Sequence, residues 1–144
     1  MSNLNRIYLS EKSDKQLRVL KSRTGLTPNL LIRIGLIYSL EESGQADIKL
    51  YGEDNFREFN RYTLLGQWDL FFMSLLKERM SEEGKNFEND IETEFKAHIS
   101  RGIHLIYQRF KSLEDLAPMI EQIEKKSELR LESLDNTISE LVDE

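Results

Sequence analysis

Alternating apolar residues at the start of the chain predict a short strand. Residues 6–10 alternate polar and apolar side chains, which places Ile7 and Leu9 inward. The outward residues are Arg6, Tyr8 and Ser10. A strand of this length needs a neighbour, and no second strand of similar quality follows nearby. We therefore expect it to pair with the same strand of a second copy.

Two helices follow this strand. The first is capped by Ser10 or Ser13, carries Leu17, Leu20 and Val19 as candidates for the core, and stops at Gly25. The second begins at Thr27 with Pro28 in its first turn and is apolar on nearly every side as far as Leu40. A helix that is apolar all round must be buried, so we expect it to pack against another subunit and make the protein an obligate oligomer.

The middle of the chain predicts two longer helices. Residues 62–80 have a broad apolar face, which indicates the central core helix, and residues 87–111 place apolar side chains at three- and four-residue steps. Residues 47–61 are mixed, with one candidate strand at 48–51. We expect a mainly α fold, with a ribbon-helix-helix-like part over residues 1–43 inside a single domain of residues 1–111.

The composition changes after Lys111. Residues 112–144 contain ten acidic and three basic side chains, with a heptad-like stripe of leucine and isoleucine that shifts phase near Ser127. Pro118 is expected to break or kink the beginning of this segment. We interpret it as an acidic amphipathic helical extension that docks on a partner, with a disordered end as the alternative.

Charge is distributed unevenly along the 144 residues, whose formal net charge is −6. Residues 1–40 carry seven basic and two acidic side chains, a net charge of +5, and the remainder carries −11. We expect Glu11 and Asp14 to lie at the positive end of the first helix, where they need not neutralise the basic residues.

A strand followed by two helices is the order of the ribbon-helix-helix fold, whose paired strands enter the major groove of DNA. The start of the second helix would also offer main-chain N–H groups to a phosphate. The alternative for the basic residues is an ordinary solvated surface. The residues predicted to bind DNA are Arg6, Lys12, Lys15, Arg18, Lys21, Arg23, Thr27 and Asn29.

Several kinds of chemistry are excluded or disfavoured. The chain has no cysteine, so it offers no thiolate nucleophile or protein-ligated iron–sulfur cluster, and it contains no glycine-rich phosphate loop. Asp90, Glu94 and His98 follow one another at one-turn intervals, but the second Glu-x-x-His of di-iron proteins is missing. We predict no catalytic residue, no metal and no cofactor. The chain also lacks a signal peptide and a membrane span, so we expect a cytoplasmic protein.

Three stretches of residues 5–111 resemble the DndE family of DNA sulfur modification proteins. They are residues 6–29, the segment EFNRYTLLG at 58–66, and the segment AHISRGI at 97–103. The first alone would suit many ribbon-helix-helix proteins, whereas the other two, in this order, are more specific.

The resemblance implies a subunit of the machinery that replaces a non-bridging phosphate oxygen of DNA with sulfur. It implies a helical homotetramer that binds nicked double-stranded DNA through surface lysines, and Lys15 and Lys21 match the family at such positions. It further implies that the protein acts with sulfur-transfer and ATPase subunits. It also implies that the cysteine chemistry belongs to those partners. Asn60 and Arg61 would either bridge subunits or contact DNA. The competing hypotheses are a ribbon-helix-helix transcriptional autoregulator and a protein scaffold within the modification complex.

Overall fold

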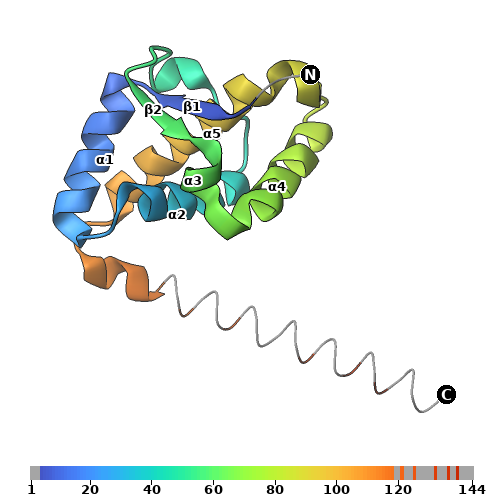
Figure 1. Ribbon diagram of the computed structural model, residues 1–144. Coiled ribbons are helices and arrows are strands. Elements are labelled where there is room, and N and C mark those ends of the chain that lie inside the picture. The colour runs from blue at the N-terminus through green and yellow to red at the C-terminus, as the bar shows by residue number, and fades with distance from the viewer. Residues whose placement is uncertain are drawn as a thin grey trace. The chain divides into compact units, whose positions relative to one another are not determined.

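The computed structural model of the chain describes residues 4–118 and positions 121, 125, 132, 136 and 139. These residues fall into two compact units, Met1–Lys111 and Ser112–Glu144, and each is described by itself. Figure 1 labels the elements of the first unit. In order they are β1 (Arg6–Leu9), α1 (Glu11–Thr24), α2 (Pro28–Glu41), the 3₁₀ turn η1 (Ile48–Leu50), β2 (Arg57–Asn60), α3 (Arg61–Leu65), the 3₁₀ turn η2 (Gly66–Trp68), α4 (Asp69–Glu82) and α5 (Phe87–Arg109).

The predicted ends of α1 and α2 are confirmed. The hydroxyl of Ser10 accepts the N–H of Ser13 at 3.1 Å, and α1 stops at Gly25, whose φ of 75° is left-handed. Thr27 caps α2, and Pro28 occupies its first turn. Ser10 is buried instead of facing outward, because its hydroxyl also donates to the carbonyl of Tyr51 at 2.6 Å.

The prediction that the first strand lacks a partner in its own chain is wrong. β1 pairs antiparallel with β2, with Arg6 opposite Asn60 and Leu9 opposite Arg57 (Figure 1). The segment predicted as a strand at 48–51 is instead η1. The sequence of β2, Arg-Glu-Phe-Asn, has one apolar residue in four, so it gives little periodic signal. The order strand, helix, helix is present, but β1 forms its ribbon with a strand of the same chain.

The core is built around α5, which runs behind α2 and the sheet (Figure 1). Its buried apolar residues recur at helical spacing through Ile91, Phe95, Ile99, Ile103 and Ile106, as predicted. α2 packs closely against α5, where a Cβ on Gly35 would lie 2.8 Å from the carbonyl carbon of Gly102. The apolar surface of α2 is therefore covered largely within the chain, and its composition does not by itself require a second subunit.

The helix predicted at 62–80 is interrupted and is not the central core helix. α3 ends at Gly66, where φ is 55° and the side chain of Arg33 donates to the carbonyl of Leu64 at 2.7 Å. Beyond this break, Trp68, Leu70 and Phe71 are exposed, Leu70 to 79%. The apolar residues of this segment thus divide between the core and the surface.

The second unit begins with the short 3₁₀ helix η3 (Leu113–Leu116). Ser112 and Asp115 form a reciprocal capping box at its start. The predicted leucine–isoleucine stripe beyond Pro118, and the helix expected to carry it, lie outside the described residues. In the part of the chain that is described, no helix combines the length and apolar character needed to cross a bilayer.

Candidate nucleic-acid interface

A row of cations follows the exposed side of α1. Leu17 and Leu20 are fully buried, and the basic residues at steps of three form an oblique row that winds about half-way around the solvent-exposed part of the helix. Lys12, Lys15, Arg18 and Lys21 are all exposed. At 1.5 Å per residue they span about 14 Å along the helix. This row is called the basic face below.

Most cations of the basic face have a local partner. Lys15 lies 3.4 Å from Glu11, and Arg18 lies 2.9 Å from Asp14. The ammonium of Lys12 donates to the carbonyl of Leu50 at 3.2 Å. Within the described part of the chain, Lys21 makes no ion pair. Because an exposed ion pair such as Lys15–Glu11 contributes only about 0–1 kcal/mol, a phosphate can replace this pair at low cost.

Asp14 does more than interact with the helix dipole, which corrects the sequence-based expectation. Its carboxylate is 1% exposed and lies 2.9 Å from both Arg18 and Arg57. Arg57 belongs to β2, so this buried acid fastens the sheet to the first turn of α1. It also partly neutralises Arg18, a residue predicted to bind DNA.

A second group of cations lies where the ends of α1 and α5 meet. Arg23 donates to the carbonyl of Tyr107 at 3.2 Å, and its guanidinium lies 4.9 Å from the centre of the Tyr107 ring. Lys111 lies 5.7 Å from the same ring. Arg109, the last residue of α5, lies 5.0 Å from the centre of the Tyr38 ring on α2. Lys111 was not predicted to bind DNA, because it lies some 90 residues from α1 in sequence and only the packing of α5 on α1 brings it to the same ring as Arg23.

The remaining predicted DNA-binding residues are separate from the basic face. Arg6 lies on β1 and pairs with Glu58 of β2 at 3.0 Å. At the start of α2, Thr27 accepts the N–H of Leu30 at 3.4 Å, Pro28 has no N–H, and Leu31 bonds to the carbonyl of Thr27. The described hydrogen bonds of this first turn leave only the N–H of Asn29 for a phosphate. The sequence had suggested that several N–H groups would be available.

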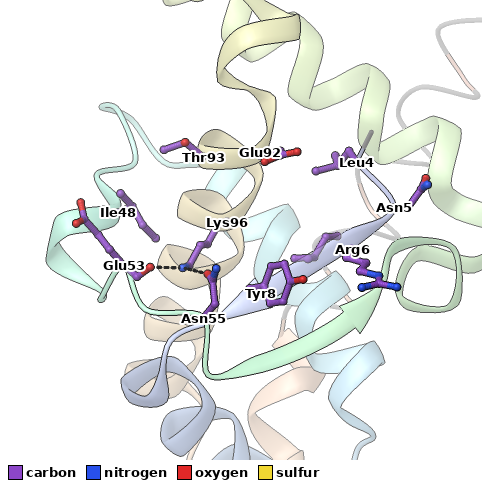
Figure 2. A pocket seen from close by; sticks show the side chains of 11 residues that line it. Leu4, Asn5, Arg6, Tyr8, Ile48, Glu53, Asn55, Glu92, Thr93 and Lys96 are labelled. Carbon is purple, nitrogen blue, oxygen red and sulfur yellow. Dashed lines mark hydrogen bonds between the residues drawn. The ribbon is translucent and has the colours of Figure 1, made fainter. Parts of the chain in front are cut away.

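A cavity of about 660 Å³ lies between β1, the 48–55 segment and α5 (Figure 2). Lys96 lies at its edge and donates to the carbonyls of Glu53 and Asp54 at 2.7 and 2.9 Å and to the side chain of Asn55. Partial burial lowers the pKa of Lys96. Glu53 and Glu92 also line the cavity. These acids and the engaged lysine make it a poor site for phosphate, so it is not part of the basic face.

The residues that carried the resemblance maintain the fold. Asn60 caps α3 by accepting the N–H groups of Tyr62 and Thr63 at 3.0 and 3.1 Å. Arg61 forms a two-bond pair with Asp69, 2.8 Å at each nitrogen, which raises the pKa of its guanidinium. Both contacts are within the chain, and these residues bridge elements of one subunit in this structure.

The AHISRGI segment forms the polar centre of the core. His98 is completely buried, and its Nδ1 lies 2.8 Å from the hydroxyl of Ser39. Arg101 donates to the hydroxyl and the carbonyl of Ser39 and to the carbonyl of Gly44 at 2.7–2.9 Å. The end of α2 is thereby fixed to α5. Burial, reinforced by Arg101, Arg79 and Lys85, lowers the pKa of His98 to about 3.

The structure resembles solved DndE proteins. Crystal structures of DndE from Escherichia coli B7A, involved in DNA phosphorothioation modification, and of a glycine-to-lysine DndE mutant involved in DNA phosphorothioation superpose with TM-scores of 0.61 and 0.58. Their sequences are 24% and 22% identical to this chain, and the matches cover 74% and 71% of this chain and 99% and 96% of theirs. At such identities these structures establish the fold.

The family follows from the sequence of the first unit. The comparison with curated proteins finds no match. The sequence model described as DNA sulphur modification protein DndE matches residues 6–114, about three quarters of the chain. This range contains all three stretches on which the resemblance was based, together with the whole of the first unit from β1 onward. The chain therefore belongs to the DndE family of DNA sulfur modification proteins.

Proposed function

We propose that this chain is a non-catalytic, cytoplasmic DNA-binding subunit of the phosphorothioation machinery. The observation that carries the proposal is the basic face, four exposed cations in a row on one rigid helix. Phosphates bind such a row without reading base sequence, and binding gains free energy from the release of counterions. Arg23 and Lys111 extend the positive surface at the end of α1.

The proposal predicts general binding to duplex DNA, with sequence left to other subunits. The chain supplies positioning, and the sulfur-transfer and ATPase components of the system supply the chemistry. A nicked duplex fits this mode if the bend at the nick brings more phosphates to α1 and the Arg23 group together. Affinity for nicked DNA should then exceed that for the same intact duplex.

The test is a titration of fluorescent intact and nicked duplexes at two salt concentrations. Replacing Lys15 and Lys21 with glutamate should weaken binding to every sequence and reduce the magnitude of the salt slope by roughly two phosphate contacts. Lys21→Glu is also measured as a single variant. Its matched control is Lys77→Glu, because Lys77 is also exposed but lies on α4. Equal binding by wild type and the double variant would refute the basic face as the DNA site.

A protein-binding role is a second candidate, supported by the surface of η2 and α4. Trp68, Leu70 and Phe71 expose 49%, 79% and 51% of their surface, and clustered exposed apolar residues are typical of protein interfaces. We propose that this surface binds another subunit of the machinery or another copy of the chain in a homotetramer. Light scattering of wild type and Leu70→Glu tests it. An unchanged mass together with unchanged co-purification of the other subunits would refute it.

The transcriptional autoregulator is less well supported. A ribbon-helix-helix repressor reads DNA with a ribbon formed by strands of two chains. Here β1 already has β2 beside it, and Arg6 is paired with Glu58 of that strand.

A further inference from the structure

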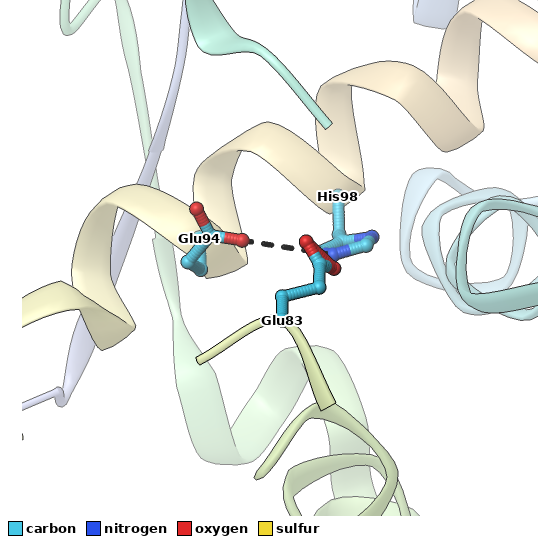
Figure 3. A group of neighbouring side chains, drawn as sticks. All are labelled: Glu83, Glu94 and His98. Atoms are coloured by element: carbon cyan, nitrogen blue, oxygen red, sulfur yellow. Dashed lines mark ion pairs between the residues drawn. The ribbon is translucent and has the colours of Figure 1, made fainter. Parts of the chain in front are cut away.

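Two buried side chains and one partly buried one, none used by the proposed function, converge at the turn between α4 and α5. Glu83 follows the last residue of α4, while Glu94 and His98 lie one helical turn apart on α5 (Figure 3). One ligand atom from each residue can be chosen so that all lie within 4.8 Å of one another. The Nε2 of His98 is 3.8 Å from Oε2 of Glu94.

Each of the three residues has a buried polar atom without a hydrogen-bond partner. In the described part of the chain these atoms are Glu83 Oε2, Glu94 Oε2 and His98 Nε2. His98 is completely buried, and Glu94 is 6% exposed. Leaving a buried donor or acceptor unpaired is costly, and here three such atoms face a common space.

The other polar atom of each group is held by a neighbour. Arg79 donates to Oε1 of Glu83 at 2.8 Å, and Lys85 donates to Oε1 of Glu94 at 2.5 Å. The hydroxyl of Ser39 lies 2.8 Å from Nδ1 of His98. Arg79 and Ser39 are outer partners of the kind that orient the ligands of metal sites, because each fixes one atom of its group and leaves the other directed at the ion, whereas Lys85 also approaches Glu83.

We propose that Glu83, Glu94 and His98 bind one divalent first-row transition-metal ion such as Zn²⁺. One imidazole and two carboxylates form a ligand set that suits this class. With bonds of about 2.0–2.2 Å, tetrahedral ligand atoms lie roughly 3.4 Å apart, so the 3.8 Å separation of His98 Nε2 and Glu94 Oε2 needs only a small contraction. This assignment revises the expectation of no metal, which was based on the missing second Glu-x-x-His motif and considered Asp90 as the third residue beside Glu94 and His98. The structure brings Glu83 to the pair instead, and Asp90 accepts the N–H of Asn86.

The protonation of the site is compatible with an ion. Nε2 of His98 can offer its lone pair to an ion when Nδ1–H donates to the hydroxyl of Ser39, 2.8 Å away. The hydroxyl of Ser39 can accept this bond and that from Arg101, because it has two lone pairs.

Nearby positive charge opposes the ion and provides a test. The ammonium of Lys85 lies 3.6 Å from Oε2 of Glu83, one of the proposed ligand atoms. Lys85 therefore competes with the metal directly, and Arg79 and Arg101 lower the affinity further. Since the site is buried, the bound ion would fasten the end of α4 to α5 and stabilise the fold.

The experiment is calorimetric titration of ZnCl₂ into the full chain after treatment with EDTA and buffer exchange. We expect one ion per chain, and visible Co²⁺ absorption that Zn²⁺ abolishes. Zn²⁺ at 100 times its dissociation constant should raise the Tm by roughly 10 °C. Wild-type protein that binds no stoichiometric Zn²⁺ overturns the proposal.

Two variants and a control assign the binding to these residues. Glu83→Gln should weaken Zn²⁺ binding at least tenfold, whereas Glu82→Gln, at the adjacent exposed position, should bind as wild type does. Lys85→Met should bind Zn²⁺ more tightly, an effect that a purely structural ion pair would not produce. If Glu83→Gln fails to fold, Lys85→Met becomes the test of the site. Zn²⁺ binding by Lys85→Met that is no tighter than binding by wild type refutes the site. Equal affinity of the Glu83 and Glu82 variants also refutes it.

Discussion

Replacing Gly102 with alanine should separate the two helices that form the core. A Cβ on Gly102 would overlap the carbonyl carbon and oxygen of Gly35 and lie 2.9 Å from its Cα. Carbon and oxygen atoms that are not bonded normally stay about 3.3 Å or more apart, so α2 and α5 would have to separate by roughly 1 Å. Both clashing partners are main-chain atoms of a helix, and neither can rotate away.

The cost follows from this geometry. Overpacking of a dense core typically costs about 1–3 kcal/mol, and a clash with main chain lies at or above the upper end. Alanine recovers about 1 kcal/mol of helix propensity relative to glycine. We therefore expect Gly102→Ala to lower the free energy of unfolding by about 2–3 kcal/mol, a large fraction of the 5–15 kcal/mol typical of a domain.

Urea unfolding followed by circular dichroism measures this loss. The matched control is Ser100→Ala, because Ser100 is buried on the same helix and its hydroxyl has no hydrogen-bond partner in the described part of the chain. Removing that hydroxyl should change stability by less than about 0.5 kcal/mol or increase it. If Gly102→Ala is as stable as wild type, the contact of the two glycines does not set the distance between α2 and α5, and the reasoning fails.

Three further predictions concern charge and the extension. The folded-state pKa of His98, about 3, lies below the unfolded value of 6.5, so the unfolded chain binds more protons between these pH values. The free energy of unfolding should fall by about 1.4 kcal/mol per pH unit as pH drops through this window. Urea unfolding curves of His98→Gln should lack this contribution. If the free energies of unfolding of His98→Gln and wild type change equally with pH, the assignment to His98 is contradicted. Asp14→Asn should lower the free energy of unfolding by about 1–3 kcal/mol, because two arginines lose a buried partner. Glu11→Gln, in an exposed pair, should change the free energy of unfolding in urea by at most about 0.5 kcal/mol. Equal losses in the two variants would count against the role of Asp14. Removing residues 112–144 should leave the Tm and DNA affinity of the first unit unchanged and abolish co-purification with other modification subunits; a truncated protein that co-purifies normally would argue against docking by this segment.

The residues of the two more specific family stretches, 58–66 and 97–103, maintain the fold. Asn60 caps a helix, Arg61 pairs with Asp69, His98 and Arg101 hold the end of α2, and Gly102 allows α2 to approach α5. Each contact requires a particular side chain, which explains how short segments can carry a specific signal. These two stretches therefore say little about the DNA contacts that we propose for the exposed side of α1.

The sequence by itself determined the features that depend on neighbours along the chain. The caps at Ser10 and Thr27, the stop at Gly25 and the apolar period of α5 follow from local hydrogen bonding and helical spacing, and the structure confirms them. The uneven charge of residues 1–40 likewise sufficed to place an exposed basic face on α1.

Only the tertiary structure decided what depends on residues far apart in sequence. The strand β2 is recognised only from its pairing with β1 in the structure, because the residues of β2 lack strand periodicity. Trp68 and Phe72 are both apolar and close in sequence, yet the break at Gly66 and the position of α5 leave one exposed and bury the other. Glu83 meets His98 only because the turn after α4 folds back along α5. Hydrophobicity specifies that a side chain favours burial, whereas the packing of distant elements determines which side chains are buried and which polar groups face one another.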